Sequence, residues 1–436
     1  MKKFASLLLA LVFICTMLFA FSLSASAEET TMPSGGGTQQ NPYSIKTMED
    51  MNWFLFIDNN SSTYEIYCDK WYELAADIGD KDHPVESYAI DNFKGHFNGN
   101  GHTVWTSTCL FSCLEGGEIT NVKMCGNIYQ HDTHKGGICD YNKGGTISDC
   151  VSNVNISYLP DPKTQGNIEE YFGGICGINA GGRIDNCTFT GSITVHNSNA
   201  SRVGGICGIN SNAAAGSVIV NCVNKGSLSN FRYNDDMSSE IGGICAVANN
   251  GTTIANCCNL GTVIGNGKYV GGICGDAFRT SKTVNCYSIG KVTGGNDSAY
   301  ISGICGNRTG SNCYYEAGTV FRGDTQIENT TEALTKAQMT AQAGETAEGK
   351  ESLVDLLNGY RENNVYPSGF NKWSNSDNSG YPEFVGVSAT GSILSGGNIW
   401  ITVIIAAVVL AGIAALIIIK KKKKPATAGG ENTDEE

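Results

Sequence analysis

The chain has 436 residues with 55 glycines, 8 prolines and 18 cysteines, and 41% of its residues are hydrophobic while 16% are charged. This composition excludes a disordered chain, because it supplies enough apolar material for a continuous core. The formal net charge of −13 argues against nucleic acid or an anionic lipid surface as the partner, since both require a positive protein surface.

The first 27 residues have the layout of a cleavable secretory signal. Two lysines precede an apolar run, and a small-residue motif that ends at Ala27 comes directly before Glu28. A first membrane-spanning helix is the alternative interpretation. We expect cleavage after Ala27 and export, followed by a flexible segment over residues 28–40.

Residues 41–96 combine a helix signal with the first strands. Thr47 is a helix N-cap candidate with Asp50 three residues on, and the apolar positions that follow, among them Met51 and Phe54, fall on one helix face. We expect a short amphipathic helix that caps the first coil of the fold that follows.

An array of repeats occupies residues 97–320. Six copies contain a Gly-Ile-Cys step, or its equivalent, as in "GGICGINAGGRIDNC" from Gly173, and their cysteines are spaced by 37, 31, 38, 29 and 31 residues. The cysteines of this step are Cys139, Cys176, Cys207, Cys245, Cys274 and Cys305. A constant motif with an uneven period indicates that loops of different length project from a constant coil.

The repeat unit is made of short β-branched segments separated by Gly and Asn, which is typical of strands. Stacking such units at the strand spacing of roughly 4.8 Å buries a continuous interior. We therefore predict an all-β fold, a right-handed parallel β-helix (solenoid) with short helical caps, plus one C-terminal transmembrane helix. One polar position per copy would stack at a corner: Asn121, Asp149, Asn186, Asn221, Asn256, Asn285 and Asn312. Ordinary turn asparagines are the alternative.

The motifs "YVGGICG" with "TVNCYSIGKV", and "RVGGICGIN" with "RIDNCTFTGSITV", resemble the GLUG repeat of bacterial surface and secreted proteins. The resemblance covers roughly residues 41 to 384. It implies a β-helical fold and exposure on the cell surface, and it implies no reaction, because members of this family differ in function.

Three interpretations of the cysteines remain open, namely buried thiols, disulfides and a metal site. In the gapless upstream copy Phe111 stands where Cys176 would be and Val122 stands where Cys187 would be, so both positions behave as apolar. No Cys-x-x-Cys pair is present. Removal of the signal leaves an odd number of cysteines, 17, so complete internal pairing is impossible. We favour buried thiols, and we predict no metal and no cofactor.

Three other groups could carry chemistry. His131, Asp132 and His134 form a weak metal-like cluster, His96 and His102 flank a glycine-rich turn, and Asp235-Asp236 lies in a variable loop. Solvated loops and turns are the simpler interpretation of each group, because paired carboxylates act on sugars only when a cleft holds them at a defined separation.

The C-terminal part is predicted to cap and anchor the protein. Residues 321–384 have helical stretches and form a cap, and residues 385–398 form a stalk. The apolar run from Ile399 to Ile419 is long enough to cross a bilayer, and the lysines from Lys420 place residues 420–436 in the cytoplasm. Without the charges of the two terminal segments, the external part carries about −16.

These features together predict a single-pass surface protein of a Gram-positive bacterium, an adhesin that is not an enzyme. Its partner would be an unknown extracellular ligand, a glycan or a protein, besides the bilayer. A carbohydrate-active enzyme is the first alternative, and two or more carboxylates with a basic residue converging in a groove across adjacent coils would favour it. An inert spacer is the second alternative.

Overall fold

The computed structural model describes residues 32–57, 63–86, 89–130, 134–159, 169–198, 201–211, 216–232, 239–295, 298, 300–328, 332–364, 369–376 and 379–385. The chain divides into two compact units, Met1–Glu383 and Phe384–Glu436, and only residues 384 and 385 of the second unit are described. The first unit contains the repeat array.

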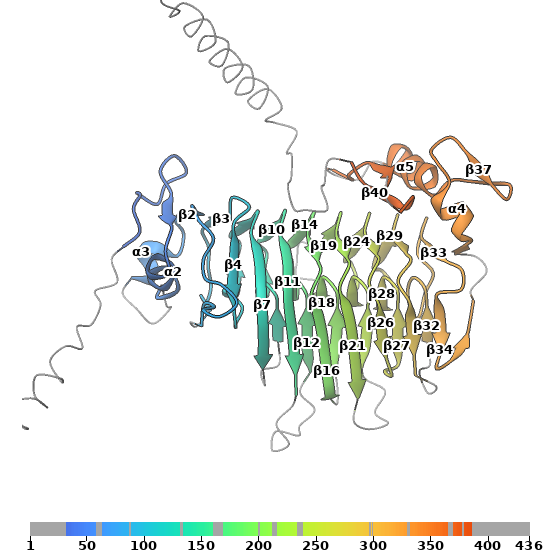
Figure 1. Cartoon of the computed structure of the whole chain (residues 1–436), viewed down its shortest axis with the longest axis horizontal. Helices are drawn as coiled ribbons and strands as arrows, with labels where there is room; N and C mark the ends of the chain where they lie inside the picture. Colours follow the sequence, from blue (N-terminus) through green and yellow to red (C-terminus); the bar gives the residue numbers. More distant parts are fainter. Residues whose placement is uncertain are drawn as a thin grey trace, which may run out of the picture. The chain divides into compact units, whose positions relative to one another are not determined.

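The array is a stack of coils that follow one another along the axis (Figure 1). Its parallel strands form four sheets, which we number I to IV. Within one coil the chain passes through β12 (Glu170–Gly173) of sheet I, β13 (Cys176–Ala180) of sheet II, β14 (Arg183–Asp185) of sheet III, and β15 (Thr188–Phe189) with β16 (Ser192–Ser198) of sheet IV. This all-β architecture with parallel sheets agrees with the predicted β-helix; its right hand stays a prediction.

The strands of the other coils repeat this path. Sheet I also contains β8 (His134–Gly136), β17 (Ser201–Gly204), β22 (Glu240–Gly242), β27 (Tyr269–Gly271) and β32 (Tyr300–Ser302). Sheet II also contains β5 (Phe111–Glu115), β9 (Cys139–Lys143), β18 (Cys207–Ser211), β23 (Cys245–Ala248) and β28 (Cys274–Ala277). Sheet III also contains β1 (Tyr43–Ile45), β2 (Trp71–Leu74), β3 (His96–Asn98), β6 (Glu118–Thr120), β10 (Thr146–Ser148), β19 (Val218–Val220), β24 (Thr253–Ala255) and β29 (Lys282–Val284).

Sheet IV has fifteen strands and closes each coil. Besides β15 and β16 it contains β4 (Thr103–Thr106), β7 (Lys123–Gln130), β11 (Val151–Tyr158), β20 (Val223–Asn224), β21 (Ser227–Arg232), β25 (Cys258–Asn259), β26 (Val263–Gly265), β30 (Tyr287–Ser288), β31 (Val292–Gly294), β33 (Tyr314–Glu316), β34 (Val320–Arg322), β35 (Thr325–Gln326) and β36 (Ala333–Leu334). Its last pair, β34 with β35, is antiparallel.

Equivalent residues of successive coils pair in register. Ile193 pairs with Ile156 of the coil before it and with Leu228 of the coil after it. In the gapless upstream copy Phe111 pairs with Cys139, as the alignment of the repeats predicts. Because apolar residues stack on their equivalents, the coils share one continuous buried core.

The Gly-Gly step has a steric cause. A Cβ atom on Gly173 would lie 1.9 Å from the carbonyl oxygen of Cys176 in the same turn. A Cβ atom on Gly174 would lie 2.2 Å from the carbonyl oxygen of Gly205 on the next coil. Both positions therefore exclude any side chain, because the bend between sheets I and II packs its backbone against its own turn and against the next coil.

The N-terminal helix α2 (Met48–Leu55) is present with a capping box between Thr47 and Asp50. Its Phe54 is fully buried, and its ring lies 5.2 Å from the ring of Phe97 and 6.1 Å from the ring of Phe111. The helix thus places an aromatic side chain in the interior of the first coils. The shorter α3 (Tyr64–Tyr67) follows it.

The described residues after β35 pack at two places: some extend sheet IV, and others lie against sheet III. β36 pairs in parallel with β33, and α4 (Lys336–Thr340) buries Met339. Beyond the short hairpin of β37 (Thr346–Ala347) and β38 (Lys350–Glu351), α5 (Leu353–Asn363) and β39 (Trp373–Asn375) lie against sheet III, and β40 (Pro382–Phe384) pairs with β39. We call residues 353–364 and 369–375 the strap.

No helix in the described part of the chain is long and apolar enough to cross a membrane. The predicted signal with Ala27, most of the stalk, the predicted span from Ile399 to Ile419, and the tail that starts at Lys420 lie outside the described residues.

Candidate functional site

The cysteines of the Gly-Ile-Cys step form a column inside sheet II. Cys176 pairs in register with Cys139 and with Cys207, and its side chain is fully buried. The 17 described cysteines are all free thiols. Burial raises the pKa of the column thiols Cys139 and Cys207 well above the ordinary value, so these two groups stay protonated and are poor nucleophiles.

The corner asparagines form a second column, and their backbones have positive φ. Asn186 has a φ of 51° and Asn256 also has a φ of 51°, a region in which Asn is tolerated better than most residues. The side-chain amide of one coil donates to the side-chain oxygen of the coil before it, as from Asn256 Nδ2 to Asn221 Oδ1 at 2.7 Å and from Asn285 Nδ2 to Asn256 Oδ1 at 2.8 Å. This column holds the corner of each coil on the previous one.

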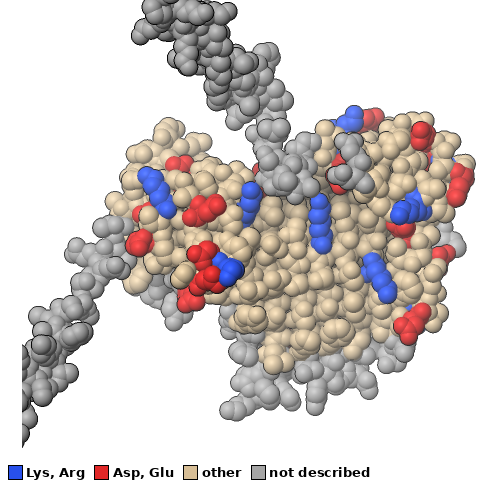
Figure 2. Space-filling view, viewed as in Figure 1, with Lys and Arg blue, Asp and Glu red and all other residues tan. Residues whose placement is uncertain are grey.

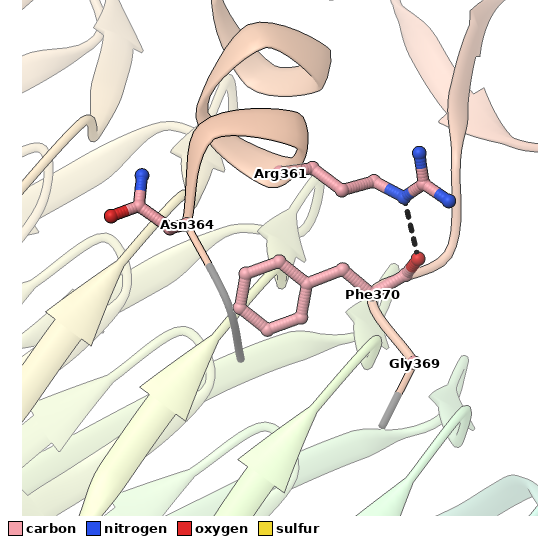
Figure 3. Close-up of a pocket in the computed structure, with 4 residues that line it drawn as sticks. All are labelled: Arg361, Asn364, Gly369 and Phe370. Atoms are coloured by element: carbon pink, nitrogen blue, oxygen red, sulfur yellow. Dashed lines mark hydrogen bonds between the residues drawn. The ribbon is translucent and has the colours of Figure 1, made fainter. Parts of the chain in front are cut away.

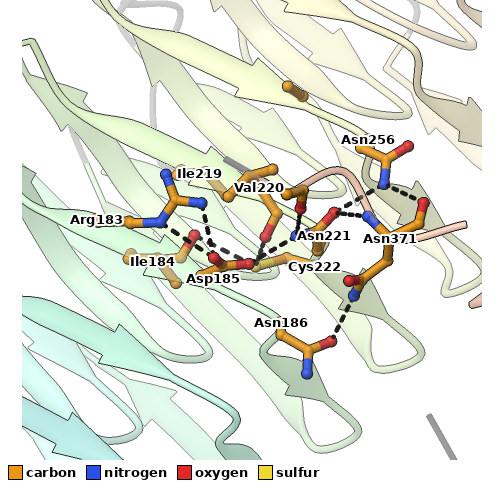
Figure 4. A network of polar contacts seen from close by, with 12 residues as sticks. Arg183, Ile184, Asp185, Asn186, Ile219, Val220, Asn221, Cys222, Asn256 and Asn371 are labelled. Carbon is orange, nitrogen blue, oxygen red and sulfur yellow. Dashed lines mark hydrogen bonds and ion pairs between the residues drawn. The ribbon is translucent and has the colours of Figure 1, made fainter. Parts of the chain in front are cut away.

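The strap inserts Asn371 into that column (Figure 4). Asn371 donates from its backbone N–H to Asn221 Oδ1 at 2.9 Å and from its side-chain amide to Asn186 Oδ1 at 3.1 Å. Asn221 Nδ2 donates to Asp185 Oδ1 at 2.8 Å and to the carbonyl oxygen of Gly369 in the strap at 2.8 Å. The corner column thus serves both to stack coils and to bind the strap.

A change of residue type in sheet III marks the place of the strap. The position before each corner residue is polar in the earlier coils, with Thr120, Ser148 and Asp185, and apolar where the strap covers it, with Val220, Ala255 and Val284. Tyr360 and Phe370 of the strap pack on these apolar residues. The change from polar to apolar residues at this position is visible in the sequence. It indicates that the outer surface of sheet III is covered there, which the sequence analysis did not predict.

A pocket on the strap is lined by Arg361, Asn364, Gly369 and Phe370 (Figure 3). The guanidinium Nε of Arg361 donates to the carbonyl oxygen of Phe370 at 2.8 Å. Residues 365–368, which connect two of the lining residues, lie outside the described part. This hydrogen bond of Arg361 joins α5 to the residues before β39 within the strap.

The outer side of sheet I carries a ladder of aromatic and charged side chains, one per coil. The position two residues before the Gly-Gly step, or Ser-Gly in the last coil, pairs in register through the whole sheet. The members of this ladder, which we call the sheet I ladder, are His134, Tyr171, Arg202, Glu240, Tyr269 and Tyr300. The repeated motif contains this position, yet only the alignment of successive coils identifies it as a continuous column.

Contacts link neighbouring members of the ladder. The rings of His134 and Tyr171 are 5.0 Å apart, and the Arg202 guanidinium lies 5.2 Å from the centre of the Tyr171 ring. The rings of Tyr269 and Tyr300 are also 5.0 Å apart, with 20° between their planes. Tyr300 is 46% exposed, so the ladder reaches solvent at that end.

The centre of the ladder is a charged cluster. Arg202 lies between Glu169 and Glu240, with Nη2 3.0 Å from Glu169 Oε1 and Nε 3.2 Å from Glu240 Oε2. Asp276 of the adjoining sheet II is close enough to act on Glu240 electrostatically. Burial raises the pKa of Glu240 to about 8, although the positive charge of Arg202 opposes that rise. Burial also raises the pKa of Asp276.

Two atoms of this cluster have no hydrogen-bond partner. They are Nη1 of Arg202 and Oε2 of Glu240, and both are shielded from solvent, although Oε2 lies 3.2 Å from Arg202 Nε in the ion pair. Glu240 is only 7% exposed. A buried polar atom without a hydrogen bond is uncommon in a protein and therefore singles out this part of the ladder.

The other groups that the sequence singled out do not meet at one place. His96 Nδ1 lies 3.0 Å from Glu118 Oε2 and His102 Nδ1 lies 3.1 Å from Asp77 Oδ1, so the two histidines have separate partners. Residues 131–133 and the acidic pair Asp235-Asp236 lie outside the described part. Among the residues that are described, no three metal-ligating side chains gather.

Charge is sparse on much of the solenoid. On the face shown in Figure 2, charged side chains are few over the central coils and more frequent towards the two ends of the array.

Comparisons with known proteins agree with this fold. Residues 169–194 match the family described as Glug, the GLUG motif, so the chain carries a GLUG repeat. A crystal structure from Bacteroides ovatus, of a protein provisionally named as an immunoglobulin A1 protease, is similar with a TM-score of 0.51 and 20% identity over 81% of this chain and 95% of that chain. A structure named IgA1 Protease has a TM-score of 0.44 and 17% identity, over 70% of this chain and 23% of that chain. No curated protein matches. The first structural likeness shows a common fold and does not transfer an activity.

Proposed function

We propose that this protein is a membrane-anchored bacterial surface protein, an adhesin whose extracellular solenoid binds a glycan, a host protein or a neighbouring cell. The proposal includes a right-handed coil, export directed by residues 1–27 and retention by the span from Ile399 to Ile419. The GLUG repeat and the β-helix-like fold support a surface role. No nucleic acid is proposed as a partner, because the external part is strongly acidic.

The observation that carries the proposal is the sheet I ladder. Aromatic and charged side chains in one continuous column are typical of binding surfaces rather than of simple scaffolding. The segments 160–168, 199–200 and 233–238 come before β12, β17 and β22 in the chain, with at most one residue between segment and strand. Each of these segments therefore leads into a strand that contributes a rung of the ladder.

A carbohydrate-active enzyme is a second candidate, and one observation favours it. Glu240, Asp276 and Arg202 come from different coils and converge, which is the arrangement such an enzyme requires. However, Glu240 is bound to Arg202 in an ion pair, and the side-chain amide of Asn307 donates to Asp276. We propose a binding role without catalysis or cofactor, because both carboxylates already have partners within the protein.

Display of the full-length chain on cells tests the proposal. We expect displaying cells to attach to surfaces coated with glycans or matrix proteins, and Tyr171→Ala with Arg202→Ala to reduce attachment strongly. Tyr129→Ala is the matched control, because Tyr129 is 74% exposed but belongs to β7 of sheet IV. Attachment that is equal in all three proteins contradicts the proposal, and so does release of products from a glycan coat.

A further inference from the structure

The spacing of the sheet I ladder is regular. Parallel strands are about 4.8 Å apart, and both aromatic pairs in the ladder have ring centres 5.0 Å apart. One monosaccharide unit of an extended polysaccharide has a comparable length. A linear glycan that lies along the solenoid axis can therefore offer one sugar to each rung.

The chemistry of the rungs is suited to sugars. The rings of Tyr269 and Tyr300 combine an apolar body with a polar hydroxyl, as a sugar combines C–H groups with hydroxyls. The centre of the ladder contains an unused donor, Nη1 of Arg202, beside the Glu240 carboxyl group. A sugar hydroxyl can accept from Nη1 after a rotation of the Arg202 side chain brings this atom to the surface.

The charge of the ladder favours an uncharged polymer. The positive charge of Arg202 is balanced by the Glu169 carboxylate, which lies 3.0 Å from Nη2. A polyanionic glycan would meet this carboxylate and the net negative charge of the domain, which repel it. A neutral glycan meets no such repulsion and still finds hydrogen-bonding groups.

We propose that the sheet I ladder binds an uncharged linear polysaccharide aligned with the solenoid axis, with about one sugar unit per rung. This inference rests on the proposed binding function and specifies its ligand. It places the ligand on the strands of sheet I.

Calorimetric titration of the purified full-length chain tests this inference. The probes are cellohexaose, chitohexaose and mannohexaose, each beside its disaccharide, together with hexagalacturonate as a charged probe. We expect at least one neutral hexasaccharide to bind about tenfold more tightly than its disaccharide, because the longer chain reaches more rungs. Hexagalacturonate should not bind.

Variants locate the site. Tyr269→Ala with Tyr300→Ala, and separately Arg202→Ala, should each weaken hexasaccharide binding at least tenfold, while Tyr129→Ala should leave it unchanged. Thermal unfolding of each variant confirms that the solenoid is folded. Any of three results overturns the inference. They are equal affinity for a hexasaccharide and its disaccharide, unchanged affinity in the ladder variants, and binding of hexagalacturonate alone.

The failure of this inference can be told apart from failure of the proposed function. If no hexasaccharide binds but displayed cells still attach through the ladder to a protein coat, the ligand class is wrong and the binding function stands. If the ladder variants change neither sugar binding nor cell attachment, both proposals are wrong.

Discussion

Asn371 donates a hydrogen bond from its side-chain amide to Oδ1 of Asn186, 185 residues earlier in the chain, at a distance of 3.1 Å. The strap is therefore attached to the same corner asparagines that stack the coils. Trp373 reinforces the attachment, because it is buried and its Nε1 donates to Asn256 Oδ1 at 2.7 Å. The C-terminal residues thus stabilise several coils from the side.

Asn371→Ala should loosen the strap. The change leaves Asn186 Oδ1 without its partner from the strap, and we expect a loss of about 1–3 kcal/mol in the free energy of unfolding. Limited proteolysis should cut the variant in the strap faster than the parent. Asn364→Ala is the control, because the Asn364 side chain donates to Tyr360 O within the strap and is exposed. Equal effects of the two substitutions would show that the corner bond is unimportant.

Gly174→Ala should prevent folding of the array. The added Cβ would lie 2.2 Å from Gly205 O and 2.3 Å from the Phe189 ring, and neither the backbone nor the buried ring can move away. Gly359→Ala is a matched control in α5, where nothing lies within 4 Å of the new atom, and it should be neutral or stabilise by about 1 kcal/mol or less. Circular dichroism and soluble yield measure both effects. A folded Gly174→Ala protein would refute the close packing of Gly174 against Gly205 and the Phe189 ring.

The cysteines should react readily with a thiol reagent only after the protein unfolds. We expect slow reaction of the native protein with a thiol reagent, because 16 of the described cysteines are buried and only Cys125 is partly exposed. After denaturation without reductant, the chain lacking its signal should release 17 reactive thiols. One free thiol or fewer would mean that the columns are oxidised.

A rise of pH from about 5 to 8 should destabilise the fold through buried carboxyls. The folded-state pKa of Glu240 is raised to about 8 and that of Glu332 to about 7, in both cases chiefly by burial. An acid whose folded pKa is raised favours the folded state below its unfolded pKa of about 4.5, and this stability is lost as pH rises through the folded pKa. The melting temperature should therefore fall between about pH 5 and pH 8.

Glu240→Gln separates this effect from other titrations. The variant should show a smaller fall in melting temperature over the same pH range, because the amide cannot ionise. Groups with lowered pKa, such as Asp77, act in the opposite direction at lower pH and are unchanged in the variant. An identical pH profile for the two proteins would mean that Glu240 is ionised in the folded state at no cost.

The repeats predict much of this fold because they encode local geometry. Stacked coils pack in one stable way when the Gly-Gly step, the corner asparagines and the apolar residues of each coil lie on their equivalents. The pairing register of the strands therefore follows from the alignment of the repeats. The strap could not be placed this way, because its contacts with Asn186 and Asn256 join residues far apart in the sequence.

The candidate site was harder to predict than the fold. Tyr171 and Arg202 each look like an ordinary strand residue in one copy of the repeat, and only the stacked coils show that they form a column. The buried asparagines Asn142, Asn179 and Asn210 were also missed, although their side chains form a chain of 2.9 Å hydrogen bonds inside the solenoid. Their common position, three residues after the cysteine of each Gly-Ile-Cys step, was the available signal.

The claim that the sheet I ladder is the binding surface is tested most directly by tyrosine footprinting. The full-length chain is oxidised with hydroxyl radicals, free and bound to its target surface, and modification is read by mass spectrometry. We predict that binding protects Tyr171, Tyr269 and Tyr300, and that Tyr129 on sheet IV reacts equally in both states. Protection of Tyr129 with unchanged reaction of the three ladder tyrosines would contradict the claim.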